Sequence, residues 1–383
     1  MTLAFTPYDI AAGAVLTIDL SALRSNYRLI RDRVCPAEVA AVVKADAYGL
    51  GAAQVAAALL KDGCRHFFVA QLSETRNLRA HLPPTAALYV LNGLLPGAEA
   101  EAIALGVIPV LNSLPQVCAW SAAGVQRGRR LPAALQVDTG MSRLGLAAGE
   151  VEQLLAHPAM LDGIDLVLLM SHLACADEPE HMANTEQLAV FRHFAAQFPA
   201  LRRSFANSGG AFLDASFHGE LVRPGIALYG ADPVPGAARL RPVVRLDARV
   251  IQVREINTGT GVGYGLTFRA SGPTRLATIG VGYADGWPRC LSERGAAYVD
   301  GVRLPIAGRV SMDSLTLDIS ALPEGALRPG DLVELIGPHQ TLDDVARDAG
   351  TIPYEILTSL GQRYARIRVD DEADFSNRVV RPA

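Results

Sequence analysis

Lysine is rare in this chain, and its scarcity narrows the search for a reactive amine. The 383 residues include 35 Lys+Arg, of which only two, Lys44 and Lys61, are lysines. Lys44 ends an apolar run, where a lysine loses its proton readily and becomes a base and a nucleophile toward carbonyl carbon. Lys44 is therefore the candidate reactive amine, although a lone lysine in such a run more often only reaches solvent.

Other polar groups also follow apolar runs in the first two thirds of the chain. They are the segment 138–140 with Arg143 just beyond it, His172, the small residues 207–210, and Arg223. A guanidinium can hold a carboxylate or a phosphate, and backbone N–H groups of a glycine-containing turn can bind a phosphate. Each group alone has an ordinary alternative, such as a surface salt bridge or a structural hydrogen bond. Their shared position favours one common site.

The elements that must position these groups are eight apolar runs, most of them separated by helix-like stretches. The runs are 38–45, 66–71, 87–92, 107–111, 133–138, 164–171, 203–208 and 220–228. This alternation predicts an α/β fold, an N-terminal (β/α)8 TIM-type barrel over residues 1–240, in which the carboxyl ends of all strands meet at one face. The helix after the second run is expected to begin with Ser73 as its N-cap. A doubly wound open sheet is the alternative, but no GxGxxG follows the first run.

Near residue 240 the pattern changes to alternating apolar and polar residues rich in Val, Ile and Thr. This predicts a C-terminal mainly-β domain over 241–383. We expect strands near 243–256, 275–281, 302–307, 315–319 and 332–336, and short helices at 341–349 and 353–360. The N-terminal run 14–20 is expected to pair with this domain.

Composition argues against several classes of partner. The net charge is −4 and no basic run occurs, which disfavours nucleic acid and anionic membranes. No apolar run approaches the roughly 20 residues of a membrane span, and Asp9 and Asp19 interrupt the N-terminal apolar residues, which disfavours a signal peptide. The five cysteines are scattered without CxxC spacing, so no structural zinc and no disulfide framework are expected. We therefore expect a cytoplasmic enzyme without a metal.

Taken together, the motifs resemble those of bacterial alanine racemases, a family of fold-type-III pyridoxal-phosphate enzymes. AVVKADAYGLG at 41–51 resembles the segment that carries the cofactor lysine. Further matches are DTGMSRLG (138–145), SHLACADEP (171–179), ANSGG (206–210), VRPGIALYG (222–230), VGYGLTF (262–268), IGVGYADG (279–286), GRVSMD (308–313) and TIPYEILTSLG (351–361). They occur in the family's order, and the resemblance covers about residues 15–368.

The resemblance implies racemisation with pyridoxal 5′-phosphate and two bases on opposite faces of the substrate. Lys44 would carry the cofactor as a Schiff base and serve the D-alanine face, and Tyr264 would serve the L-alanine face. A phenol with a pKa near 10 is a poor base at neutral pH, so its phenolate needs help. The family pattern places His172 against this tyrosine, and Arg223 against both His172 and the pyridine nitrogen. A guanidinium keeps its proton, so that nitrogen should stay unprotonated.

The resemblance also assigns binding residues. Those implied for the cofactor are Tyr48, Asn207, Ser208, Gly225, Ile226 and Tyr354, and those implied for the substrate are Arg143, Tyr283, Met312 and Asp313. In the family, the residues matching Tyr264, Tyr283, Met312 and Asp313 come from the other subunit. We therefore expect a homodimer with composite active sites and an inactive monomer. Such an enzyme would supply D-alanine for the bacterial cell wall, or serve alanine catabolism.

Two departures from the family pattern and three other readings remain. Gln136 stands where many members have a carbamylated lysine, so we predict no carbamylation, and Leu50 stands where a histidine is common.

A single-barrel cofactor-binding protein without catalysis would lack Tyr264 and the Met-Asp motif. An amino-acid decarboxylase of this fold would need a catalytic cysteine motif, and Cys290 lies outside one. A racemase acting on serine or on a broader range of amino acids stays open.

Overall fold

The computed structural model describes residues 11–234, 236 and 239–370, and these form two compact units. One unit contains 23–228 and the described part of 232–240; the other contains 11–22, 229–231 and 241–370. The sequence boundary near 240 separates the units at that junction, whereas residues 11–22 join the strand-rich unit. Within the described residues, no helix is long and apolar enough to cross a membrane.

The first unit is a parallel barrel. Strands β3 (Ala41–Val42), β4 (His66–Val69), β5 (Ala87–Val90), β6 (Ile108–Leu111), β7 (Leu131–Gln136), β8 (Ile164–Met170) and β9 (Arg202–Ser204) form one sheet in chain order. Most of their residues are buried, as expected for parallel strands covered on both faces. All eight predicted runs contribute strand residues, which confirms the predicted barrel.

Backbone hydrogen bonds close the barrel. Strand β10 (Leu221–Val222) pairs in parallel with β2 (Glu38–Val39), which directly precedes β3. The amide of Val42 donates to the carbonyl oxygen of Pro224 at 3.1 Å, and the amide of Arg223 donates to that of Ala206 at 3.0 Å. The eighth run therefore bonds to the first and the seventh, and the carboxyl ends of the strands form one face.

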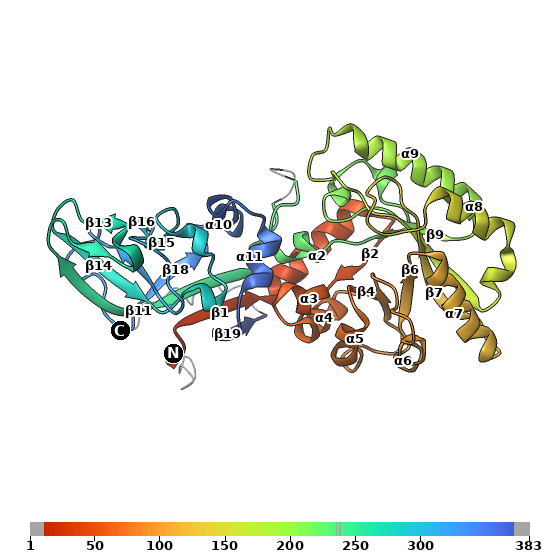
Figure 1. Cartoon of the computed structure of the whole chain (residues 1–383), viewed down its shortest axis with the longest axis horizontal. Helices are drawn as coiled ribbons and strands as arrows, with labels where there is room; N and C mark the ends of the chain where they lie inside the picture. The colour runs from red at the N-terminus through yellow and green to blue at the C-terminus, as the bar shows by residue number, and fades with distance from the viewer. Residues whose placement is uncertain (1–10, 235, 237–238, 371–383) are drawn as a thin grey trace. The chain divides into compact units, whose positions relative to one another are not determined.

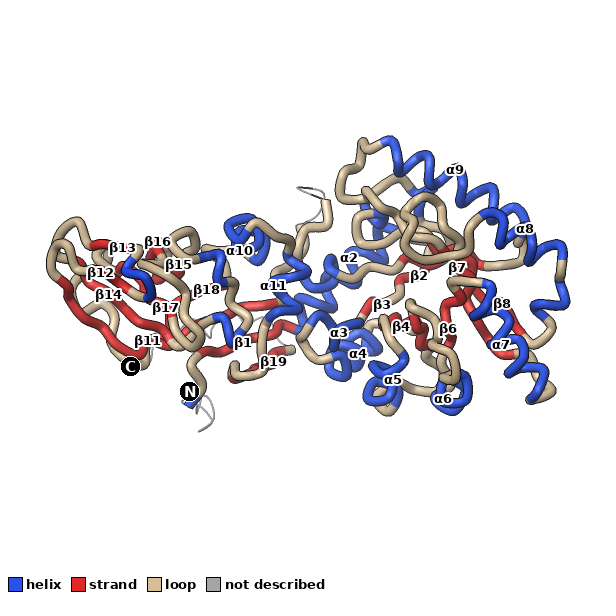
Figure 2. The backbone as a smooth tube through the Cα atoms, viewed as in Figure 1, coloured by secondary structure: helices blue, strands red, loops and turns tan. Residues whose placement is uncertain are grey.

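One helix precedes the first barrel strand, and the other helices of this unit follow the strands in turn (Figures 1 and 2). They are α2 (Leu20–Val34), α3 (Lys44–Tyr48), α4 (Ala52–Lys61), α5 (Leu72–Arg79), α6 (Glu99–Leu105), α7 (Leu114–Gln126), α8 (Ala148–Ala156) and α9 (Met182–Gln197). The predicted Ser73 cap is wrong, because α5 begins at Leu72 and its N-cap is Gln71. Ser73 therefore lies in the first turn of the helix.

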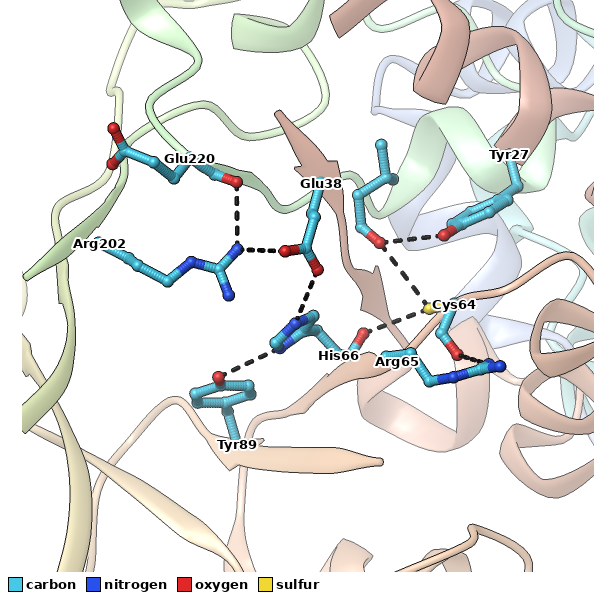
Figure 3. Close-up of polar contacts among 9 residues, drawn as sticks. Tyr27, Glu38, Cys64, Arg65, His66, Tyr89, Arg202 and Glu220 are labelled. Carbon is cyan, nitrogen blue, oxygen red and sulfur yellow. Dashed lines mark hydrogen bonds and ion pairs between the residues drawn. The ribbon is translucent and has the colours of Figure 1, made fainter. Parts of the chain in front are cut away.

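A polar cluster lies near the amino ends of the barrel strands, opposite the catalytic face expected for this fold. Glu38 accepts hydrogen bonds from Arg202 Nη2 at 2.8 Å and contacts His66 Nε2 at 3.1 Å, while His66 Nδ1 lies 3.2 Å from the Tyr89 hydroxyl (Figure 3). Burial lowers the pKa of His66. Because these residues come from β2, β4, β5 and β9, the cluster joins strands across the barrel floor.

The second unit is strand-rich. Its largest sheet has the order β16 (Val302–Pro305), β15 (Ala296–Val299), β18 (Leu332–Ile336), β11 (Val244–Ile256), β1 (Ala14–Asp19), β19 (Ala365–Val369), with β14 (Thr274–Ile279) and β17 (Leu315–Asp318) branching from β11. β1 pairs antiparallel with β11 and parallel with β19, as predicted for the N-terminal run. Helices α10 (Leu342–Ala349) and α11 (Pro353–Ser359) match the prediction closely. The sequence analysis missed β15, β19 and the hairpin of β12 (Gly261–Val262) and β13 (Phe268–Arg269).

Candidate active site

Lys44 introduces an unusual turn at the end of the first barrel strand. The next four residues, 45–48, have φ between 52° and 56°, although none is glycine. L-residues avoid this left-handed region, at roughly 1–2 kcal/mol for each residue. Hydrogen bonds to the surroundings hold the turn, including one from the Ala52 amide to Asp46 Oδ1 at 2.7 Å. Such strain commonly occurs at functional sites.

Three positive side chains share this end of the barrel with His172. Burial and the charge of Arg143 lower the pKa of Lys44, while the charge of Glu74 raises it. Burial, followed by the charges of Arg223, Arg143 and Lys44, lowers the pKa of His172 to about 3. His172 is therefore uncharged at neutral pH, and a larger fraction of Lys44 is a free amine than in water.

Arg223 is buried, with 3% of its surface exposed. Its Nη2 donates to the carbonyl oxygen of Ser171 at 2.6 Å and its Nη1 donates to Ser204 Oγ. Among the described residues, no carboxylate forms an ion pair with it. Burial lowers its pKa to about 9, which still leaves the guanidinium charged at neutral pH. A buried cation without a protein counter-ion fits a site that receives a polar or anionic ligand.

A small cradle is formed where the seventh and eighth strands end. Ser208 Oγ accepts hydrogen bonds from the Gly225 amide at 2.8 Å and the Ala227 amide at 3.3 Å. A Cβ added to Gly225 would lie 2.2 Å from the Tyr48 hydroxyl oxygen, so only glycine fits there. The amide of Ile226 makes no hydrogen bond within the described part of the chain. These hydroxyl and N–H groups are suited to an oxyanion such as a phosphate.

Asn207 has a structural role, and Gln136 is separate from Arg143. Asn207 accepts a hydrogen bond from the Gly210 amide at 2.9 Å and donates to the carbonyl oxygen of Leu173 at 3.4 Å, so its side chain shapes the turn after β9. Gln136 is buried at the end of β7, and no hydrogen bond joins it to Arg143 in the described residues.

The loop that carries Arg143 is built by Asp138. One carboxylate oxygen of Asp138 accepts hydrogen bonds from three successive amides, at 2.9 Å from Gly140 and 3.1 Å from Met141 and Ser142. Ser142 adopts a positive φ of 57°. The loop therefore has a defined shape, which places the charge of Arg143 within range of Lys44 and His172.

The remaining predicted residues lie in the strand-rich unit. Tyr264, Met312, Tyr283 and Tyr354 have 71%, 52%, 43% and 40% of their surface exposed, which is high for side chains of this size. Asp313 accepts a hydrogen bond from Arg363 at 2.7 Å. The structure thus brings the N-terminal half of the predicted set together in the barrel and leaves the C-terminal half on the other unit.

Two residues were missed by the sequence analysis. Glu74 contacts the backbone beside Lys44, and Gln187 on α9 donates to Thr139 Oγ1 at 3.1 Å and to the carbonyl oxygen of His172 at 2.9 Å. The only sequence signal for Glu74 was its position as a glutamate in the first turn of a predicted helix. Gln187 gave no signal, because its partners are distant in sequence.

Comparison with known proteins adds to this picture. Residues 18–233 match the family model for the alanine racemase N-terminal domain, and residues 243–368 match that for the C-terminal domain. A catabolic alanine racemase of Agrobacterium fabrum is 58% identical over 93% of this chain and 92% of its own length. An alanine racemase of Brucella canis is 56% identical over 94% and 95%, respectively. The crystal structure of alanine racemase from Bartonella henselae with covalently bound pyridoxal phosphate has a TM-score of 0.91 and 47% identity, covering 94% of this chain and all of that chain.

The fold and the site together define a class. A (β/α)8 barrel with a lysine after its first strand, an anion cradle after its seventh and eighth strands, and a strand-rich second unit is the architecture of the fold-type-III enzymes that the sequence resembles. Within this class the assignment is narrower, because both family models and the relatives span nearly the whole chain. The chain belongs to the alanine racemase family.

Proposed function

We propose that this protein interconverts L-alanine and D-alanine, with pyridoxal phosphate held by the barrel unit and proton transfer by Lys44 and Tyr264. Family membership supports the reaction and the cofactor. The observation that carries the site assignment is the group of Lys44, Arg143 and Arg223 around an uncharged His172. This arrangement favours the free-amine form of Lys44 and places two anion-binding cations beside it.

The cradle in the barrel unit supports binding of the cofactor phosphate. Ser208 Oγ already accepts two N–H groups, so its own hydrogen can be donated to a phosphate oxygen, and the Ile226 amide can donate as well. The Tyr48 hydroxyl lies beside Gly225 at the same cradle. Lys44 would hold the aldehyde carbon covalently, and Tyr354 would add a hydroxyl from the strand-rich unit. When bound, pyridoxal phosphate withdraws electrons from the substrate Cα and makes its C–H acidic.

The chain's own groups then control the proton. Lys44 accepts or returns a proton on one face of the substrate, which its lowered pKa favours. Tyr264 acts on the opposite face, and His172 and Arg223 stabilise its phenolate form. Because Arg223 stays charged, it would donate to the ring nitrogen of the cofactor and leave that nitrogen unprotonated. Arg143 would bind the substrate carboxylate or the cofactor's phenolic oxygen.

The active unit in this proposal is a homodimer with composite sites. Tyr264, Tyr283, Met312 and Asp313 would reach the barrel of a second copy, and the exposure of Tyr264 in the single chain supports this arrangement. Mixing Lys44→Arg and Tyr264→Phe proteins tests it. Each is inactive alone, and random subunit exchange in a two-fold dimer should restore about a quarter of the wild-type sites. No recovery after verified exchange would exclude composite sites.

Three finer assignments belong to the same proposal. All five cysteines are free thiols, which supports a reducing, cytoplasmic location. We infer no carbamylated side chain at Gln136, and an intact mass without a carbon dioxide adduct would agree. D-Alanine supply to the cell wall and alanine catabolism both fit the reaction, and rates with L-alanine, D-alanine and L-serine would establish the substrate range.

The deciding experiment traps the cofactor and separates the two bases. Borohydride reduction of the purified protein followed by peptide mapping should label Lys44, and Lys61→Arg is the matched control. In D2O, Tyr264→Phe should lose exchange of the L-alanine α-proton by at least about 100-fold, while Lys44 still exchanges that of D-alanine. If labelling is absent after the cofactor is added, or if Tyr264→Phe racemises like the wild type, the proposal is wrong.

A further inference from the structure

The turn that follows Lys44 is held by a carboxylate from a different element. Glu74, in the first turn of α5, accepts a hydrogen bond from the Ala45 amide through Oε2 at 2.6 Å. Its other oxygen, Oε1, accepts from the Gln71 amide at 2.8 Å and the Ala70 amide at 3.0 Å. One side chain therefore joins the residue next to the reactive lysine to the loop and helix after the second barrel strand.

Helix capping alone does not account for this geometry. Glu150 occupies the equivalent first-turn position of α8, where it accepts from the Ala147 amide at 3.0 Å, and its second oxygen reaches the Leu114 amide only at 3.4 Å. The shortest contact of Glu74, at 2.6 Å, is the one to Ala45, which lies far from α5 in sequence. The Ala45 amide belongs to four consecutive non-glycine residues with positive φ, a conformation that requires external support.

Only a carboxylate can satisfy both ends of this link. A glutamine has one carbonyl oxygen and one amino group, and the amino group donates rather than accepts. In Glu74→Gln, either the Ala45 amide or the cap of α5 would therefore face another donor. Glutamate is therefore required here for its two hydrogen-bond acceptors, since glutamine has nearly the same size but only one.

We propose that Glu74 is a positioning residue that holds the left-handed turn 45–48 and thereby sets the direction of the Lys44 side chain toward the cofactor. The inference rests on the proposed role of Lys44 but adds a residue that does not touch the substrate. The same carboxylate opposes the effect of Arg143 on the pKa of Lys44, which is consistent with its position beside that amine.

Four variants of the full-length protein test the proposal: Glu74→Gln, Glu150→Gln, Ala45→Gly and the Glu74→Gln/Ala45→Gly double variant. Glu150→Gln is the matched control, since it removes a first-turn glutamate from a helix without a link to the turn. Ala45 is exposed, so its glycine variant loses no buried contact and relaxes a positive φ. Amide hydrogen exchange of residues 45–49 in the cofactor-free protein reports on the turn, and the dissociation constant for pyridoxal phosphate reports on Lys44.

Glu74→Gln should increase the rate of amide hydrogen exchange at residues 45–49 and the dissociation constant for pyridoxal phosphate, each by about tenfold. Glu150→Gln should leave both quantities at their wild-type values. The double variant should recover part of the lost affinity, because a glycine turn needs less support. Equal exchange and affinity in Glu74→Gln and the wild type would overturn the inference, as would equal losses in both glutamine variants. If the wild type itself forms no borohydride-trapped adduct on Lys44, the proposed function fails, and the exchange data still test whether Glu74 holds the turn.

Discussion

Substituting Gly225 by alanine is the most direct test of the cofactor cradle. The new methyl group would lie 2.2 Å from the Tyr48 hydroxyl oxygen, 3.1 Å from Tyr48 Cζ and 3.5 Å from Val42 Cβ. The first distance is far below van der Waals contact, and Tyr48 has only 4% of its surface exposed, so its ring can move away only by disturbing the packing around it. We expect the hydroxyl, rather than the backbone of the eighth strand, to be displaced.

The size of the effect follows from overpacking. Adding a methyl group to a well-packed site typically costs about 1–3 kcal/mol of folding free energy. In the proposed site, displacing the Tyr48 hydroxyl would also remove one hydrogen bond to the cofactor phosphate, and hydrogen bonds to charged groups contribute about 1.5–3 kcal/mol. Since about 1.4 kcal/mol corresponds to a factor of ten, pyridoxal phosphate should bind roughly 10- to 100-fold more weakly.

The assay needs two readouts and two controls. Urea unfolding of the cofactor-free protein gives the stability, and fluorescence titration gives the dissociation constant for pyridoxal phosphate. Gly149→Ala is the matched control, because no atom lies within 4 Å of a Cβ added there. Alanine in helix α8 should leave the stability unchanged or raise it. Tyr48→Phe in the Gly225→Ala background removes the clashing oxygen, so stability should recover while cofactor affinity stays low.

The reasoning is refuted by either of two results. Wild-type stability and affinity in Gly225→Ala would mean that the barrel end is loose enough to absorb the methyl group. Failure of Tyr48→Phe to restore stability would mean that the strain arises elsewhere, for example at Val42.

Three further predictions concern residues around the site and at the barrel floor. The pKa of His172 is about 3 in the folded protein and about 6.5 in the unfolded chain, so between these pH values only the unfolded state binds a proton. The free energy of unfolding should therefore decrease as the pH drops from about 6.5 to about 3, and it should decrease less steeply in His172→Gln. Urea unfolding at a series of acidic pH values measures this difference. Gln187→Leu should destabilise the protein by about 1–3 kcal/mol by urea unfolding, since it leaves the carbonyl oxygen of His172 without its partner, while Thr139 Oγ1 keeps its hydrogen bond to Ser171; a loss below about 0.5 kcal/mol would contradict this. Glu38→Gln should cost less than about 1 kcal/mol in the same assay despite its two ion-pair contacts, because its carboxylate side chain is 55% exposed.

The barrel could be predicted because its strands give a strong local signal. Parallel strands covered on both faces appear as continuous apolar runs, and their order fixes which ends meet. Lys44, His172 and Arg223 could be selected for the same reason, since each lies at or near the end of such a run. The resemblance to a known family then supplied roles that position alone could not.

The features that were missed depend on contacts between distant segments. The hairpin of β12 and β13 has two residues in each strand, too few for an alternating pattern to appear. The left-handed turn after Lys44 could not be predicted, because residues 45–48 include no glycine, the usual sequence signal for a positive φ. Glu74 looked like an ordinary first-turn glutamate, because its bond to Ala45 spans 29 positions in sequence.

Charge balance links the strained turn to the rest of the site. Lys44, Arg143 and Arg223 bring three basic groups to the barrel end, and the carboxylates described there accept hydrogen bonds from backbone amides. These carboxylates are Asp46, Glu74 and Asp138. Gln136 adds no negative charge. A phosphate dianion together with a substrate carboxylate would add negative charge at a barrel end where Arg223 has no ion pair within the described residues. The cofactor-loaded protein should therefore be more stable than the cofactor-free protein, because a ligand that binds only the folded state shifts the folding equilibrium toward it.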